Sequence, residues 1–131
     1  MAAFVTLSAA LIVAPHEATA TETGESDWVI YAEAANGDLH FYDPSRVERV
    51  DMVRRVWTRV RYKTSVMGAS GFRSLLEIDC AGGTGKALQS TFFTDRNWEK
   101  PAMKTDTSEK QKRRIVPGSA TGRLTEVVCD N

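Results

Sequence analysis

Basic and aromatic side chains alternate between residues 53 and 63. From residue 55 to residue 63, every second residue is a cation or a tryptophan. These five residues are Arg55, Trp57, Arg59, Arg61 and Lys63. Every second residue of a β-strand points to the same side, so these side chains share one cationic surface with an aromatic centre. Guanidinium and ammonium groups donate to phosphate, sulfate and carboxylate oxygens. The segment therefore predicts a face that binds an anionic glycan, a lipid headgroup or an acidic protein.

A second basic cluster lies near the C-terminus and extends the predicted binding surface. Its members are Lys110, Lys112, Arg113 and Arg114. A simpler interpretation of both clusters is a solvated face on which arginine stems cover Trp57. Two further alternatives stay open, which are pairing with the acidic N-terminal part of the chain and an edge that forms a homodimer.

No pattern in the sequence predicts catalysis, a metal site or a cofactor. The glycine-rich segment 82–86 lacks the first glycine and the final Ser/Thr of a phosphate-binding P-loop, so it predicts a turn. His40 has no nucleophile partner, and Asp43 and Asp79 have the positions of turn-capping residues. Metal ligation needs ligand spacing that scattered acids and His40, the one histidine of the expected mature chain, do not provide. We therefore expect a protein that is not an enzyme.

The charge balance excludes a dedicated nucleic-acid binder. The chain has 131 residues, with 17 Lys and Arg against 17 Asp and Glu, so the formal net charge is zero. The cations are unevenly distributed, because all of them lie at or after Arg46. The preceding stretch is acidic, and the two parts can face each other in the fold.

The two cysteines, Cys80 and Cys129, predict a disulfide. Each lacks the near neighbour that metal ligation or thiol chemistry uses, and the chain carries the features of an exported protein. Closing a loop of about fifty residues stabilises a fold by about 4 kcal/mol in the chain-entropy model.

The N-terminal segment predicts export. Met1 to Ala14 is apolar and uncharged, and Ala18-Thr19-Ala20 has the small residues of a signal-peptide cleavage site. We expect a signal peptide at 1–20, a flexible lead at 21–26 and one domain at 27–131. The apolar run is shorter than the ~20 residues of a membrane span. The expected location is periplasmic or secreted, with no lipid anchor through the cysteines of the chain.

The rest of the sequence predicts an α+β domain. Alternation and turn residues indicate five strands, two of them in a hairpin, and Ser119 precedes a segment with apolar residues at helical spacing. Lysines and arginines dominate 95–114, which predicts an exposed loop. The expected elements are a hairpin of residues 28–31 and 39–42, strands at 53–63, 72–80 and 86–94, and a helix at 119–129. Together they form a meander-like antiparallel sheet with a C-terminal helix packed on it and tethered by the disulfide.

This order of features resembles the surface-adhesin protein E family of bacterial exported proteins, over roughly residues 27 to 130. The matching features are Trp28, Asn36-Gly37, Tyr42-Asp43, the strand around Trp57, Ile78-Asp79-Cys80, Pro117-Gly118-Ser119 and Val128-Cys129. The resemblance implies an antiparallel sheet with a disulfide-tethered C-terminal helix, an envelope location and adhesion to host matrix and plasma proteins. The family's prototype is lipid-anchored, whereas this chain offers no anchoring cysteine.

The sequence thus predicts an exported, adhesin-like binding protein that contacts an anionic ligand of the host matrix or the cell envelope. The alternative is a periplasmic accessory or inhibitor protein that binds another envelope protein. In both cases the expected partner is a protein, or an anionic glycan or lipid, and no nucleic acid.

Overall fold

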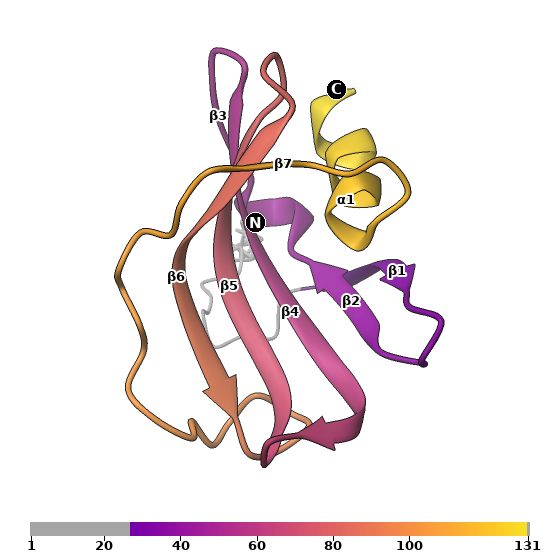
Figure 1. The fold of residues 1–131 in the computed structure, drawn as a ribbon, viewed down its shortest axis with the longest axis vertical. Coiled ribbons are helices and arrows are strands. Elements are labelled where there is room, and N and C mark those ends of the chain that lie inside the picture. The colour runs from indigo at the N-terminus through magenta and orange to yellow at the C-terminus, as the bar shows by residue number, and fades with distance from the viewer. Residues whose placement is uncertain (1–26, 131) are drawn as a thin grey trace, which may run out of the picture.

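The fold is an antiparallel sheet with one C-terminal helix, as predicted (Figure 1). The computed structural model describes residues 27–130, so the predicted signal peptide and flexible lead lie outside the described residues. Within them, the sheet has seven strands. Six follow the order β1-β2-β4-β5-β6-β7, and the seventh, β3, pairs with β4. The elements are β1 Val29–Glu33, β2 Leu39–Tyr42, η1 Pro44–Arg46, β3 Glu48–Val50, β4 Val53–Val66, β5 Ala69–Asp79, β6 Thr84–Phe93, β7 Arg113–Arg114 and α1 Ala120–Cys129.

The predicted hairpin is confirmed as β1 and β2. Gly37 has a φ of +96° in the turn, a conformation that glycine adopts without a steric penalty. The Asn36 side chain accepts a hydrogen bond from the Asp38 N–H, which fixes the turn. After β2 the buried carboxylate of Asp43 accepts from the N–H and hydroxyl of Ser45 and starts the short helix η1.

The three long strands β4, β5 and β6 give the sheet two distinct faces. On β4 the side chains of Val56, Thr58 and Val60 are buried on one side, which we call the helix face. Trp57 and Arg59 point to the opposite side, which we call the tryptophan face. The two faces continue from β4 across β5 to β6, because side chains paired in register lie on the same side of the sheet. The helix face includes Val56, Leu76 and Ala87, and the tryptophan face includes Arg59, Arg73 and Thr91.

The main core lies between the helix face and α1. Val56 and Ile78 of the sheet pack against Leu124 and Val128 of the helix, and all four are almost completely buried. The helix begins where the Ser119 hydroxyl accepts a hydrogen bond from the Gly122 N–H, a capping contact that the sequence predicted.

The Cys80–Cys129 disulfide is present, as predicted, and joins the end of β5 to the last turn of α1. The two Cα atoms are 5.7 Å apart, and 49 positions separate the residues in sequence. The bridge therefore fixes the C-terminal end of the helix at the end of the sheet where β4 begins and β5 ends.

The segment 95–114 differs in part from the predicted exposed loop. Trp98 is only 8% exposed, although the rest of the stretch from 96 onward is exposed. The chain then follows the outer edge of β6, with bridges at Phe93↔Pro101 and Ser90↔Asp106, and pairs as β7 before it crosses the sheet to reach α1 (Figure 1). The prediction was wrong for Trp98 because its burial depends on contacts distant in sequence.

Candidate anion-binding face

All three tryptophans of the chain take part in a stack of rings and guanidinium groups on the tryptophan face. The Arg59 guanidinium carbon lies 4.1 Å from the ring centroid of Trp28 and 3.8 Å from that of Trp98. Arg46 lies 5.7 Å from Trp28 and 5.8 Å from Trp57. These distances are within the range of cation–π attraction. The stack therefore alternates cations and aromatic rings across the face.

Arg61 extends the stack towards β2. Its guanidinium carbon is 4.7 Å from the Trp98 ring and 5.5 Å from Phe41. Its Nε donates a hydrogen bond of 3.1 Å to the carbonyl oxygen of Arg96. Phe41 and Trp98 also contact each other edge to face, with centroids 5.6 Å apart. Arg61 is thus held by rings and by the loop that carries Trp98.

The loop after β6 positions Trp98 over the strands. The indole N–H donates to the Val60 carbonyl oxygen at 3.0 Å. The Asp95 carboxylate accepts from the backbone N–H groups of Asn97, Glu99 and Lys100, which closes the turn around the tryptophan. Below the ring lies Gly71, where a Cβ atom would come within 3.0 Å of the indole. The absence of a side chain at this position of β5 makes room for the ring.

Arg73 adds a further cation to the face. It sits beside Arg59 in register, 5.9 Å from the Trp57 ring and 5.1 Å from Phe93. Burial lowers the pKa of Arg73, and the nearby charge of Arg46 lowers it further. Within residues 27–130, Arg73 makes no ion pair with a carboxylate. Arg46 does, through an Nε–Oδ2 contact of 2.6 Å with Asp43.

A hollow of about 480 Å³ opens beside Trp57. Arg46 and Arg55 line it together with Glu48, and Leu75 contributes to its apolar part. This space is large enough for part of a ligand, since small-molecule sites typically measure about 300 to 1,000 Å³. The hollow adjoins the stack, so a ligand group bound there would lie close to Arg46.

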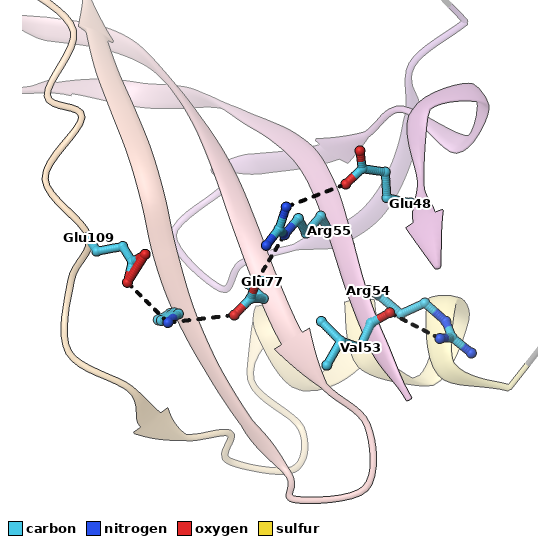
Figure 2. Close-up of polar contacts among 7 residues, drawn as sticks. Glu48, Val53, Arg54, Arg55, Glu77 and Glu109 are labelled. Carbon is cyan, nitrogen blue, oxygen red and sulfur yellow. Dashed lines mark hydrogen bonds and ion pairs between the residues drawn. The ribbon is translucent and has the colours of Figure 1, made fainter. Parts of the chain in front are cut away.

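Arg55, one of the predicted binding residues, is engaged in ion pairs (Figure 2). Its guanidinium contacts Glu77 at 2.9 Å and Glu48 at 3.7 Å. Lys86 continues the row, with contacts of 3.6 Å to Glu77 and 3.1 Å to Glu109. The hydrogen bond that the Arg55 Nε donates to Glu77 raises the pKa of Arg55. Arg55 therefore belongs to a row of two cations and three carboxylates that crosses the strands.

The structure does not bring all predicted residues together. Trp57, Arg59 and Arg61 lie in the stack, and exposed Lys63 follows them on β4. The second basic cluster lies elsewhere, along the edge of β6 and at the helix face. There Lys110 pairs with Asp106 at 2.7 Å, Lys112 lines a small crevice beside Glu77 and Asp79, and the residues of β7, Arg113 and Arg114, are exposed.

Sequence reasoning missed Trp28, Arg46, Arg73 and Trp98 as members of this face. Arg73 had a usable signal, because it alternates with the apolar positions of the strand 72–80 and so points to the other side. Arg46 and Trp98 lie outside the strands, and only the folded chain brings them to the stack.

The remaining polar residues between positions 27 and 130 form no recognisable centre for chemistry. His40 lies on the helix face with its ring centroid 5.9 Å from that of Tyr31. Asp43 and Asp79 accept hydrogen bonds from neighbouring residues in turns. In the described part of the chain, no cluster of three His, Cys, Asp or Glu side chains has the arrangement of a metal site. No helix among these residues is sufficiently long and apolar to span a bilayer.

Comparisons with known proteins place the chain in a family. A profile described as Surface-adhesin protein E matches residues 28–130. No curated protein matches the chain.

Solved structures of Haemophilus influenzae protein E have the same fold. One is 11% identical with a TM-score of 0.63, and the alignment covers 82% of this chain and 87% of the other. A second crystal form, also 11% identical, gives a TM-score of 0.65, with coverage of 82% and 91%. Protein E from non-typeable Haemophilus influenzae gives 0.61 at 11% identity, with coverage of 82% and 78%.

Proposed function

Because the chain belongs to the surface-adhesin protein E family, we propose that it is an exported, non-catalytic binding protein that engages an anionic ligand through its tryptophan face. The ligand belongs to the host matrix or to the cell envelope and presents sulfate, phosphate or carboxylate groups. The protein acts in the periplasm or after secretion. This function joins the family's adhesin character to the charge distribution on one face of the sheet.

The observation that carries the proposal is the excess of guanidinium groups on this face. Arg46, Arg61 and Arg73 all contact its aromatic rings, and only Arg46 pairs with a carboxylate among the described residues. A cation that loses hydration water without gaining a carboxylate partner lowers the stability of the fold, and such cations gather at functional sites. An anionic ligand supplies the missing counter-charge.

The rings also prepare the cations for binding. A free arginine side chain loses rotamer freedom when it is fixed by a ligand, at a cost of about 0.5 to 1.5 kcal/mol. Arg59 and Arg61 are already held by Trp28, Trp98 and Phe41. Their planar forks match the two oxygens of a carboxylate or phosphate. Of the predicted residues, Trp57, Arg59 and Arg61 form the centre of the site, while Arg55 and Lys63 lie at its ends.

The test is binding to heparin, to vesicles with anionic lipids and to purified matrix proteins, each at about 50 and 200 mM salt. The informative variant is Arg46→Gln/Arg73→Gln, which leaves the Arg59 stack in place. We expect affinity at least tenfold weaker, with a smaller salt dependence. The matched control is Arg49→Gln/Arg123→Gln, because both arginines are exposed and belong to β3 and α1.

Equal losses in the two variants would show that only the overall charge matters and would contradict the tryptophan-face site. Binding that is insensitive to salt and to both variants would favour the alternative, an accessory or inhibitor protein with an apolar interface to another envelope protein.

A further inference from the structure

A second hollow, of about 500 Å³, lies on the opposite face of the sheet. It is bounded by the helix face of β5 and β6, by the segment around β7 and by the start of α1, and we call it the β7 hollow. Its apolar wall is formed by Leu76, Ile78, Ala87, Ile115 and Val116. It is distinct from the tryptophan face, so the inference below does not rest on the proposed function.

Small residues on β6 create this space. Gly85 pairs with Ile78, and Ala87 pairs with Leu76. The large side chains of β5 therefore have only a glycine and an alanine beside them on β6. A Cβ atom at position 85 would already approach the Ile115 side chain to 3.4 Å. The hollow thus results from two small residues at neighbouring positions of the same face.

The segment around β7 is fixed on both sides of the hollow. The Lys110 N–H donates to the Ala87 carbonyl oxygen, and the Ile115 N–H donates to the Gly83 carbonyl oxygen, both at 2.9 Å. These bonds hold the segment beside β6 and place its side chains at the rim. The space is therefore part of the folded architecture.

The rim is cationic. The lining includes Lys86, Lys110, Arg113 and Arg114 and contains no carboxylate. Lys86 and Lys110 have acidic partners outside the hollow, namely Glu77, Glu109 and Asp106. Arg113 and Arg114 form no ion pair within residues 27–130. They are neighbours on β7 and therefore point to opposite sides, and Arg113, in register with Gly85, is the one on the side of the hollow. An apolar floor below such a rim is complementary to a molecule with one apolar end and one anionic end.

We propose that the β7 hollow binds an unbranched fatty acid, with the alkyl chain against Leu76, Ala87 and Ile115 and the carboxylate at Arg113. The volume is within the range of about 300 to 1,000 Å³ that small-molecule sites occupy. A glycan would leave the apolar floor without contacts, and a neutral apolar molecule would leave Arg113 without a counter-charge. A fatty acid satisfies both.

The experiment is isothermal titration of the oxidised full chain with decanoate, dodecanoate and tetradecanoate below their micelle concentrations. We expect affinity to rise about three- to fourfold with each added methylene, because each is transferred from water to the apolar floor. Dodecyltrimethylammonium, which has the same chain with the opposite charge, is expected to bind at least tenfold more weakly than dodecanoate.

Two variants locate the site. Ala87→Leu fills the hollow from β6 and is expected to weaken tetradecanoate binding at least tenfold. Arg113→Gln/Arg114→Gln removes both charges of β7, including that of Arg113 at the hollow, without touching the floor. We expect a loss of about tenfold with the dependence on chain length preserved. Arg49→Gln/Arg123→Gln is the charge-matched control, since neither residue lines the hollow, and it is expected to bind like the original chain.

The proposal is overturned if affinity is the same from decanoate to tetradecanoate, if the alkylammonium binds as tightly as the carboxylate, or if the Arg113/Arg114 variant binds like the control. Should Ala87→Leu prevent folding, the Arg113/Arg114 variant and the comparison of head groups still decide. Binding of an acidic peptide in place of any fatty acid would also overturn it.

Discussion

Arg54 of β4 reaches the C-terminal end of α1, where its Nε donates a hydrogen bond of 3.1 Å to the carbonyl oxygen of Val128. Its Nη1 donates to the carbonyl oxygens of Asp51 and Val53, the latter contact visible in Figure 2. The side chain is buried. The last carbonyls of a helix carry partial negative charge and lack intrahelical donors, so a cation stabilises this end. Arg54 thus links the sheet to the helix near the disulfide.

Arg54→Met is expected to lower the free energy of unfolding by about 2 to 3 kcal/mol, because a charged donor to one buried and two partly buried carbonyl oxygens is lost. Arg54→Lys should restore little of this, since an ammonium group lacks the planar fork that reaches the three oxygens. Urea denaturation measures the change. Arg49→Met is the control, because exposed Arg49 pairs with Arg54 across β3 and β4; equal losses in both variants would contradict a specific role of Arg54.

Replacing both cysteines, Cys80→Ser/Cys129→Ser, is expected to lower the free energy of unfolding by about 4 kcal/mol under oxidising conditions, since the denatured chain then regains the freedom of the open loop. Denaturant unfolding with and without a reductant gives the value. The reductant should destabilise only the original chain, and identical melting temperatures for the variant and the original would refute a stabilising bridge.

Trp98→Ala is expected to cost about 3 to 5 kcal/mol of unfolding free energy, as large truncations in packed sites do. The change removes the ring between Arg59 and Arg61 and the donor to the Val60 carbonyl oxygen. Thermal unfolding tests it, and Met103→Ala, at a side chain 65% exposed in the same segment, is the control. A loss below 1 kcal/mol for Trp98→Ala would mean that the stack contributes little to the fold.

His40 makes stability depend on pH. Burial lowers the pKa of His40 below the ordinary value of 6.5, and Asp38 opposes part of this shift. The unfolded chain therefore takes up the proton at higher pH than the folded chain, so this contribution to stability is complete above pH 6.5 and is lost as the pH falls further. Melting temperatures between pH 7.5 and 5.5 measure the effect. The decrease should be smaller in His40→Gln, and an equal decrease would assign it to other groups.

Much of the fold could be predicted because the sequence expresses it locally. The alternation from Val53 onward, the turn at Asn36-Gly37 and the Ser119 cap each determine local structure, and all three appear in the sheet and helix. The disulfide followed from the two cysteines. β3 and β7 were missed because they have three and two residues, too few to show a period, and depend on pairing with β4 and β6.

The candidate site was only partly predictable. The alternation placed Trp57, Arg59 and Arg61 on one side correctly, but it predicted a single aromatic ring there and not the further rings of Trp28 and Trp98. Trp98 reaches Val60 across 38 positions of sequence, and such contacts leave no local pattern. For the same reason Lys110 and Arg114 could not be assigned to a different part of the molecule from Arg59.

The disulfide also determines what a protease can do to this protein. The covalent ring that Cys80 and Cys129 close contains β6, the exposed segment that follows it, β7 and all of α1. Exposed segments are the preferred places of cleavage. A single cut between the two cysteines leaves both fragments joined through sulfur, with the strand pairings still in place. In an environment rich in proteases, the chain can thus be nicked at its most accessible segment without separating into pieces.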